Sequence, residues 1–375
     1  MSFDFDVAVV GAGVVGLAVA AELAGAGREI CVIERHAACG QETSSRNSEV
    51  IHSGIYYPPG TLKARLCVEG KRLLYDLCAA RGLPHRRTGK LVVAADEGEV
   101  RDLEALAANG RRNGVDDLAL LTRAELGRME PRVRGAAALW SPSTGILSAH
   151  DLMRDLAGRA REKGVAFLLN AEVVGLEPAA GGWRVAVREG GALQDVHARR
   201  VVNSAGLRSD AVAGLAGVDV NEAGYTLRFN KGEYFRLRRR PETTVERLVY
   251  PVPYGEGGWL GVHITVDLQG EIKLGPSAFD VDDLDYSVDP AHAQDFHTAG
   301  RRYLPDLRLE DIQPDMAGIR PKLGPRGDEG FRDFVIREES DRGLAGLVNL
   351  IGIESPGLTA ALAIAATVRA LLGWG

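Results

Sequence analysis

Cysteine is scarce in this sequence, and the four cysteines that occur form no recognisable site. Cys31, Cys39, Cys67 and Cys78 include no C-x-x-C pair and no histidine spacing suited to zinc. We therefore expect reduced, mostly buried thiols and no bound metal.

Long apolar runs and surplus positive charge are also missing. No stretch reaches the roughly 20 apolar residues that a membrane-spanning helix needs, and residues 1–6 are acidic where a secretory signal is basic. The 45 Lys and Arg residues against 51 Asp and Glu residues give a net charge of −6, which disfavours binding to nucleic acid phosphates. We therefore expect a cytoplasmic protein with no nucleic acid partner.

What the chain does have is enough length and enough apolar residues for two domains. It has 375 residues, of which 45% are hydrophobic and 26% are charged, as in ordinary globular proteins. The apolar patterns predict strands at 5–10, 29–33, 91–95, 165–169, 173–176 and near 200–206. They predict helices from about 12 to 26 and at 62–80, 97–112 and 150–163, with a closing helix after residue 355. Aromatic and β-branched segments between about 222 and 315 favour an antiparallel sheet.

These patterns together predict an α/β fold (α+β overall). A Rossmann-like nucleotide-binding domain would carry an inserted, mainly antiparallel sheet. We expect residues 1–85, 146–218 and 316–375 to form the discontinuous nucleotide-binding domain. Residues 86–145 and 219–315 would form a substrate-binding domain.

The most specific motif is a glycine-rich turn between the first strand and the first helix. Gly11, Gly13 and Gly16 fit G-x-G-x-x-G. In this motif the first glycine makes a tight turn, the second lets the backbone approach a pyrophosphate, and the third lets helix and strand pack closely. Glu34 follows at the end of the next strand, where its carboxylate can accept hydrogen bonds from a ribose diol. The motif predicts a dinucleotide site but does not separate FAD from NAD.

The next segments carry a resemblance to a known family. The chain contains "SSRNSEVIHSGIYYPPGTLKARLCVEG", "EPRVRGAAALWSPSTGIL", "VVNSAGLRSD", "YPVPYGEGGWLGVHIT", "MAGIRP" and "GIESPGLTAALAIA". In this order they resemble the D-amino-acid-oxidase-like superfamily of FAD-dependent oxidoreductases, and most closely its L-2-hydroxyglutarate dehydrogenase/oxidase group. The resemblance covers nearly the whole chain and implies that the nucleotide is FAD.

The glycine motif and the resemblance together imply a set of FAD-binding residues along six segments. They are Gly11, Gly13, Val14, Val15, Gly16, Glu34, Arg35, Thr43, Ser44, Ser45, Arg46, Asn47, Ser48, Val173, Ala205, Gly206, Gly352, Ser355, Pro356, Gly357, Leu358 and Thr359. The residues themselves suggest Ser355 as the N-cap of the closing helix, with Pro356 in its first turn. Some relatives tether FAD to a cysteine in the C-terminal part of the chain. No cysteine follows Cys78, so we expect non-covalent FAD unless a histidine provides the tether.

Several residues are candidates for the reaction itself. His52 or His263 could act as the base that takes a hydroxyl proton. Arg320 suits a carboxylate because its planar guanidinium binds both oxygens and stays charged. Tyr250 could donate a second hydrogen bond to the substrate. Lys273 resembles, by position, a lysine that some related amine oxidases keep near the flavin.

The resemblance implies oxidation of a small (S)-2-hydroxy acid, similar to 2-hydroxyglutarate, to the 2-oxo acid by hydride transfer to flavin N5. Oxygen or a quinone would accept the electrons. An amine or amino-acid oxidase (glycine, sarcosine or D-amino-acid type) and a flavoprotein subunit without turnover remain as alternatives.

Two basic features have no assigned role. Lys231 stands where relatives carry a basic residue. The arginine-rich residues 236–240 suggest a solvated loop, or a contact with the inner face of a membrane. The substrate tail and the oligomeric state do not follow from the sequence.

Overall fold

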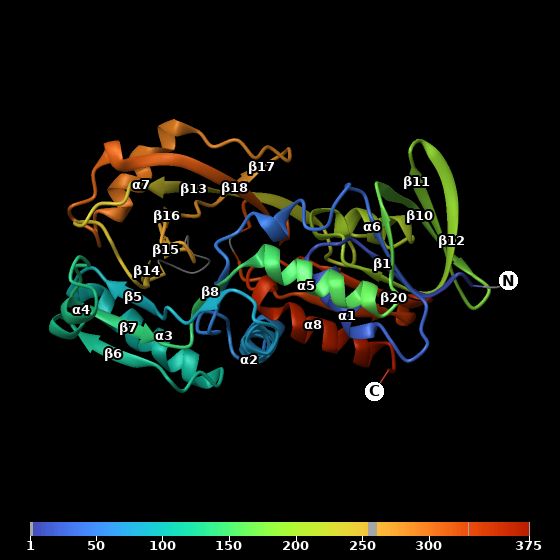
Figure 1. Cartoon of the computed structure of the whole chain (residues 1–375), viewed down its shortest axis with the longest axis horizontal. Helices are drawn as coiled ribbons and strands as arrows, with labels where there is room; N and C mark the ends of the chain where they lie inside the picture. Colours follow the sequence, from blue (N-terminus) through green and yellow to red (C-terminus); the bar gives the residue numbers. More distant parts are fainter. Residues whose placement is uncertain (1–2, 254–260, 329, 375) are drawn as a thin grey trace.

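The structure is a computed structural model that describes residues 3–253, 261–328 and 330–374. Two large β-sheets lie toward opposite ends of its long axis, and segments far apart in the chain contribute to each (Figure 1). The resembling segment at 250–265 includes residues 254–260, which fall outside the described residues. No helix in the described part of the chain is long and apolar enough to cross a membrane.

The first sheet contains the strand–helix–strand unit at the start of the chain. Its order is β10 (Ala171–Ala179), β11 (Gly182–Glu189), β12 (Ala192–Asn203), β1 (Phe5–Val10), β2 (Ile30–Glu34) and β9 (Ala166–Leu169). β20 (Leu344–Ile351) pairs with β12, and β19 (Val335–Glu339) pairs with β20. β1 runs parallel to both β2 and β12, and its last four residues are buried, as expected for a parallel strand covered on both faces.

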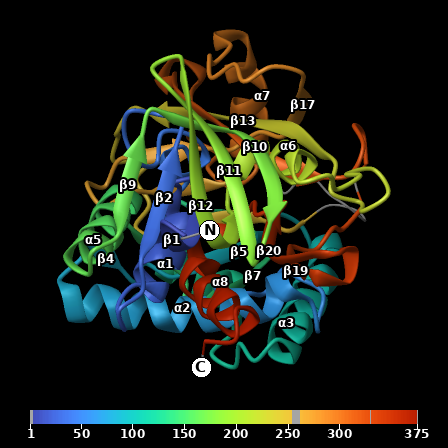
Figure 2. The ribbon, with the colours of Figure 1, turned by 90° about the vertical axis from the view of Figure 1, so that its right-hand side faces the viewer.

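Four helices pack beside this sheet and against one another. They are α1 (Val14–Leu23), α2 (Leu62–Arg81), α5 (Ala149–Glu162) and α8 (Gly357–Leu371), and α1 contacts α5 and α8 while α2 contacts α8. Figure 2 shows the strands side by side, with α2 and α8 below them in that view. The short helix α6 (Ser209–Leu215) contacts β10 and β20. α1 is rich in Ala and Val and contains Gly16, and these small side chains let the neighbouring helices approach closely.

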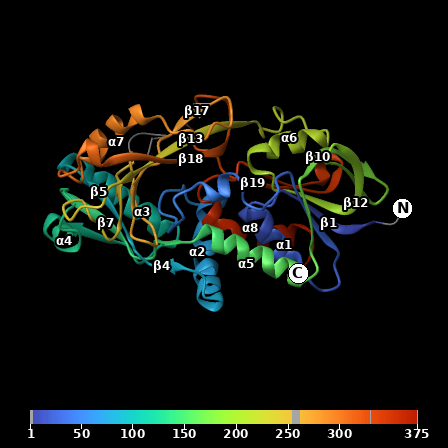
Figure 3. The ribbon, with the colours of Figure 1, turned by 45° about the horizontal axis from the view of Figure 1, so that its top comes forward.

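The second sheet is mainly antiparallel and follows the order β17 (Phe279–Val281), β13 (Leu227–Leu237), β16 (Ile272–Leu274), β15 (Ile264–Val266), β14 (Leu248–Pro251), β5 (Lys90–Ala94), β7 (Ala137–Ser141) and β6 (Ala119–Thr122). β18 (Ile312–Leu323) pairs with β13 along its whole length. α7 (Ala293–Gly300) contacts β18, whereas α3 (Val100–Arg112) and α4 (Arg123–Met129) contact β7 (Figure 3).

A small third sheet, formed by β3 (Val50–Ile51), β8 (Gly145–Leu147) and β4 (His85–Arg86), connects the two parts of the chain. The elements predicted from apolar patterns are present, with shifted ends. α1 ends at Leu23 rather than near residue 26, because Gly25, Ala26 and Gly27 have φ values of 103°, 53° and 73° that no helix accommodates. The expected domain boundary at residue 316 falls within β18.

Candidate functional site

The glycine turn has the close contacts that its sequence motif requires. Gly11 has φ +98°, and a Cβ there would lie 2.6 Å from the Ser204 carbonyl oxygen. A Cβ at Gly13 would lie 2.9 Å from Ser44 Oγ, and a Cβ at Gly16 would collide with the Gly11 carbonyl oxygen. The turn therefore leaves the backbone at Gly13 open to a ligand, while Gly16 lets α1 pack on β1.

Glu34 lies at the end of β2 and is held by the backbone around it. Its carboxylate accepts hydrogen bonds from the Ala12 N–H at 2.8 Å and from the His36 N–H at 2.9 Å. Arg35 forms an ion pair with Glu42. Glu34 and Arg35 both line a cavity, in which the Glu34 oxygens can accept further hydrogen bonds.

Two adjoining cavities run along the edge of the glycine turn. One has a volume of about 440 Å³ and the other about 230 Å³, and both are lined by Gly13, Thr43, Ser44, Ser204 and Gly206. We call them the nucleotide cavity and the reaction cavity. The nucleotide cavity is also lined by Gly11, Glu34, Arg35, Val173 and Ala205. This long shape suits a dinucleotide, with its pyrophosphate at the shared residues.

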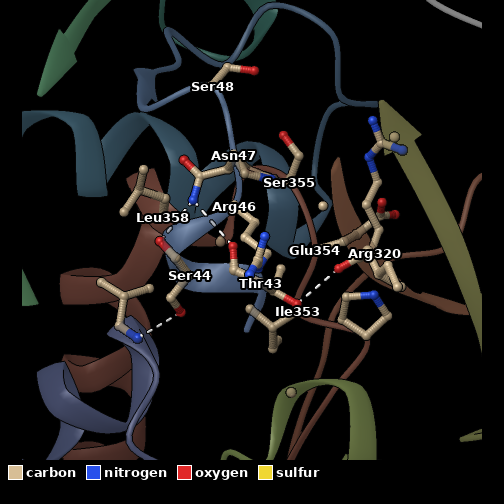
Figure 4. Close-up of a pocket in the computed structure, with 18 of the residues that line it drawn as sticks. Thr43, Ser44, Arg46, Asn47, Ser48, Arg320, Ile353, Glu354, Ser355 and Leu358 are labelled. Carbon is tan, nitrogen blue, oxygen red and sulfur yellow. Dashed lines mark hydrogen bonds between the residues drawn. The ribbon is translucent and has the colours of Figure 1, made fainter. Parts of the chain in front are cut away.

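The hydroxyl-rich segment from Thr43 to Ser48 crosses the junction of the two cavities (Figure 4). Ser44 Oγ accepts a hydrogen bond from the Val14 N–H at 3.0 Å, and Thr43 Oγ1 donates to the Ile319 carbonyl oxygen at 2.9 Å. These bonds join η1 (Thr43–Ser45) to the start of α1 and to β18. Ser45 instead donates to the Glu42 carbonyl oxygen at 3.1 Å and does not line either cavity.

Helix α8 begins at the reaction cavity, as expected, but its cap differs from the prediction. Pro356 is the N-cap residue, and no side chain caps the helix. The prediction that Ser355 is the N-cap is therefore wrong: Ser355 precedes the cap, and its Oγ lies 3.5 Å from His52 Nε2. Pro356, Gly357 and Leu358 line the cavity.

Two predicted cofactor residues of this region lie outside the cavity lining. A Cβ at Gly352, which has φ +69°, would lie 2.5 Å from Leu323 Cγ, so this glycine permits a close packing contact. Thr359 is buried inside α8.

His52 lies in the reaction cavity, between β3 and α2. Its backbone N–H donates to Thr359 Oγ1 at 3.0 Å, and its carbonyl oxygen accepts a weak bond from Cys67 Sγ at 3.5 Å. Its ring Nδ1 is buried without a hydrogen-bond partner among the described residues. Burial, and secondly the positive charge of Lys90, lower the pKa of His52 to about 3. The imidazole is therefore neutral at physiological pH.

His263 and Tyr250 form one wall of the same cavity. Their rings stack with centroids 3.5 Å apart and an interplanar angle of 8°. Burial raises the pKa of Tyr250, so its hydroxyl is a hydrogen-bond donor at neutral pH. The two candidate bases and the candidate donor thus lie around one space.

Arg320 enters the reaction cavity from β18 (Figure 4). Its Nη1 donates to Asn230 Oδ1 at 2.9 Å, and both Nη atoms donate to the Ser277 carbonyl oxygen at 3.2 Å. A Cβ at Gly232 would lie 2.9 Å from Arg320 Nη2, so glycine at this position of β13 makes room for the guanidinium. Neither hydrogen-bond partner is charged, which leaves the cation available to an anionic ligand.

Positive charge dominates beside Arg320. Glu354 lines the cavity and pairs with Lys63, whose Nζ lies 2.9 Å from Glu354 Oε1. Burial alone would raise the pKa of Glu354, but the positive charges of Lys63, Lys322 and Arg320 hold it below its usual range. Three cations therefore surround one carboxylate, an arrangement that favours a further anion.

The structure places three basic features away from the cavity. Lys273 pairs with Asp315 at 3.3 Å and does not line the reaction cavity, which corrects the expectation that it stands beside the flavin. Lys231 lies on the face of β13 opposite to Asn230 and Gly232, because successive side chains of a strand point to opposite faces. On that face its Nζ pairs with Asp285 at 2.8 Å. In the arginine-rich segment, Arg236 pairs with Asp315 and Arg240 with Asp311.

Sequence reasoning missed several residues of the cavity. Tyr234 lines it, and its hydroxyl lies 3.0 Å from Ser48 Oγ. The alternation in "NKGEYF" carried the signal, because Asn230, Gly232 and Tyr234 share one face of β13.

Arg46 was predicted to touch the cofactor. It lines the reaction cavity, and its guanidinium lies 4.3 Å from the Tyr286 ring centroid.

Comparisons with known proteins agree with this geometry. The family described as "FAD dependent oxidoreductase" matches residues 6–371. The chain is 41% identical to a mitochondrial L-2-hydroxyglutarate dehydrogenase of Arabidopsis thaliana, over 96% of this chain and 82% of that protein. It is 32% identical to a glycerol 3-phosphate dehydrogenase of Caloramator mitchellensis, over 98% of this chain and 74% of that protein. Among solved structures, the FAD-bound L-α-glycerophosphate oxidase of Mycoplasma pneumoniae matches with a TM-score of 0.88 at 29% identity, covering 100% of this chain and 96% of the other.

Proposed function

We propose that this chain, which belongs to the family of FAD dependent oxidoreductases, oxidises a small (S)-2-hydroxy acid to the 2-oxo acid. The observation that carries the proposal is the meeting of Arg320, His52 and His263 in one cavity that adjoins the glycine turn. The similarity to L-2-hydroxyglutarate dehydrogenases supports a substrate similar to 2-hydroxyglutarate.

The residues at the glycine turn fit FAD. Gly13 lines both cavities at the point where a pyrophosphate would lie, and Glu34 offers carboxylate oxygens in the nucleotide cavity. Val173 and Ala205 would border the adenosine half, and the start of α8 would face the flavin with its positive end. When bound, FAD supplies the acceptor of the substrate's hydride. No cysteine lines either cavity, which fits non-covalent binding.

The side chains of the reaction cavity divide the remaining work. Arg320 binds the substrate carboxylate and fixes the position of the carbon that carries the hydroxyl group. His52 would accept the hydroxyl proton on a ring nitrogen. Its lowered pKa keeps the imidazole neutral, as this role requires, and also makes it a weaker base than a free imidazole. Tyr250 and Tyr234, which line the cavity, would donate hydrogen bonds to the substrate, and His263 is the rival base.

We extend the proposal to the division of the chain. Residues 1–85, 146–218 and 316–375 would hold the cofactor, and residues 86–145 and 219–315 would form the substrate wall. Oxygen or a quinone would reoxidise the enzyme, and the cytoplasm, with at most a peripheral contact with the membrane's inner face, is the proposed location. The Arabidopsis relative carries the word mitochondrial in its name, so location is tested separately by cell fractionation.

Anaerobic bleaching of the flavin absorbance tests the function. The FAD-loaded protein is mixed in turn with (S)-2-hydroxyglutarate, (S)-lactate, glycerol 3-phosphate, glycine and sarcosine. We expect rapid bleaching by (S)-2-hydroxyglutarate and slower or no bleaching by the others. Bleaching by glycine or sarcosine alone would favour an amine oxidase. Loss of colour with none of these compounds would contradict the proposal and leave a flavoprotein subunit without turnover.

A further inference from the structure

A buried lysine with no carboxylate partner among the described residues lies behind the reaction cavity. Lys90, the first residue of β5, has an exposed fraction of 0%. In the part of the chain that the structure describes, its Nζ has no hydrogen-bond partner and no carboxylate forms an ion pair with it. A buried charge is costly in a folded protein because it loses its interactions with water. An ion pair or a set of hydrogen bonds normally offsets this cost.

Aromatic rings provide the only close compensation for this charge in the part of the chain that the structure describes. Lys90 Nζ lies 4.3 Å from the centroid of the Tyr56 ring and 4.7 Å from that of the Tyr250 ring. Cation–π contacts of this kind contribute about 0.5–2 kcal/mol each, less than a buried ammonium requires. Burial accordingly lowers the pKa of Lys90 to about 7.

Within the described ranges, the titratable groups that face Lys90 are held neutral. They come from the loop between β3 and α2, from α2 and from β14, and they are His52, Tyr56, Cys67 and Tyr250. Burial lowers the pKa of His52 to about 3, raises that of Cys67 to about 12 and raises those of both tyrosines. Around neutral pH, Lys90 is therefore the group of this cluster that carries charge.

We propose that Lys90 supplies a buried positive charge that draws an anionic ligand into the reaction cavity, acting across the Tyr250 ring without touching the ligand. Lys90 does not line the cavity, whereas Tyr250 and His52 do. Lys90 is fully buried, so its attraction for an anion in the cavity is weakly screened. Lys90 is a positioning residue that complements Arg320, which contacts the ligand directly.

The proposal links anion binding to the protonation of Lys90. A carboxylate in the cavity favours the ammonium form, so binding must weaken as the pH rises through about 7. The inference rests on the proposed function only in taking the ligand to be anionic.

Binding of malonate and of 2-oxoglutarate to the oxidised, FAD-loaded protein tests the proposal. The dissociation constant is read from the change in the visible flavin spectrum at pH 6.5, 7.5 and 8.5. We expect the wild-type constant to rise roughly tenfold across this range. Lys90→Met should weaken binding roughly tenfold at pH 6.5 and remove the pH dependence, while Lys90→Arg should keep most of the affinity and lose the pH dependence.

Lys71→Met is the matched control, since Lys71 lies on α2, binds Ser143 Oγ at 3.0 Å and does not line the reaction cavity. It should behave as the wild type. Equal affinity of Lys90→Met and wild type at pH 6.5, with intact flavin absorbance, would overturn the proposal. Should Lys90→Met not retain FAD, a wild-type dissociation constant that does not change with pH would overturn it as well. Binding needs no turnover, so a protein that binds malonate as expected but is bleached by no 2-hydroxy acid contradicts the proposed function alone.

Discussion

The Thr359 hydroxyl accepts a hydrogen bond from the His52 backbone N–H at 3.0 Å and donates one to the Val50 carbonyl oxygen at 3.2 Å. This side chain therefore joins the first turn of α8 to the loop that carries the candidate base. Gly70 strengthens the junction, because a Cβ there would collide with the Thr359 carbonyl oxygen and push α2 away from α8. The closing helix thus sets the position of the histidine, although more than 300 residues separate them in sequence.

Thr359→Val should lower the free energy of unfolding by about 1–3 kcal/mol, because two buried backbone groups lose their partner while the shape is kept. Urea denaturation measures the change. Thr367→Val on the same helix is the control: Thr367 donates only to Ala363 O, one turn earlier in α8, and should cost less. An equal loss in both variants would show that the junction with His52 adds nothing.

Gly13→Ala should weaken FAD binding at least about tenfold, since the added Cβ occupies space at the pyrophosphate position and presses on Ser44 Oγ. Gly13 has φ −73°, so alanine causes no backbone strain there. Fluorescence titration of apoprotein with FAD gives the affinity. Gly158→Ala, where nothing lies within 4 Å of the added Cβ, should bind FAD as the wild type does. An unchanged affinity of Gly13→Ala would contradict the pyrophosphate assignment.

The glycine turn could be predicted from sequence because its requirement is local and steric. Gly11, Gly13 and Gly16 leave a signature within six residues, and spacing alone located Glu34. The strand register of the second sheet cannot be read from neighbouring residues in the same way, because its strands come from distant parts of the sequence. Lys273 was expected near the flavin, but its place opposite Arg236 in the β13–β16 pairing turns it toward Asp315.

Lys90 shows a different limit of sequence reasoning. In "GKLVVA" it resembles an exposed residue at the start of a strand, because an uncompensated buried lysine is rare and has no sequence signature. Its burial depends on Tyr56 and Tyr250, which come from distant segments. Ser355 was misassigned as an N-cap because the sequence shows only its neighbours, and a serine before a proline is typical of a helix start. In the structure its hydroxyl lies near His52, which comes from a distant segment.

Arg320→Lys should lower kcat/KM for the 2-hydroxy acid roughly a hundredfold, since lysine cannot bind both carboxylate oxygens in the fixed geometry that Asn230 and Ser277 impose. Most of the loss should fall on KM. Steady-state kinetics separate KM from kcat. Arg326→Lys, an exposed residue paired with Asp282, is the matched control and should leave both constants unchanged. A lysine variant with wild-type KM would exclude Arg320 as the carboxylate ligand.

His52→Asn should lower kcat by roughly 10²–10⁴-fold if His52 takes the hydroxyl proton, because asparagine cannot accept it. His263→Asn should lower kcat less, since stacking on Tyr250 is then its main contribution. Single-turnover reduction of the flavin under anaerobic conditions measures both variants. The reverse order of effects would assign the base to His263.

The pH dependence of stability tests the burial of His52 without reference to turnover. Its pKa is lowered from 6.5 to about 3 in the folded protein, so between these values the unfolded chain binds one proton more than the folded chain. The free energy of unfolding must therefore fall as the pH drops from 6.5 toward 3. In His52→Gln the free energy of unfolding should fall less steeply with decreasing pH, by at most about 1.4 kcal/mol per pH unit.

Denaturant unfolding at pH 4.5, 5.5 and 6.5 measures the slope of the free energy of unfolding against pH. His150→Gln, on the exposed side of α5, is the control and should keep the wild-type slope. Identical slopes for His52→Gln and wild type would mean that the ring is protonated or solvated in the folded protein, and the neutral base would have to be sought at His263.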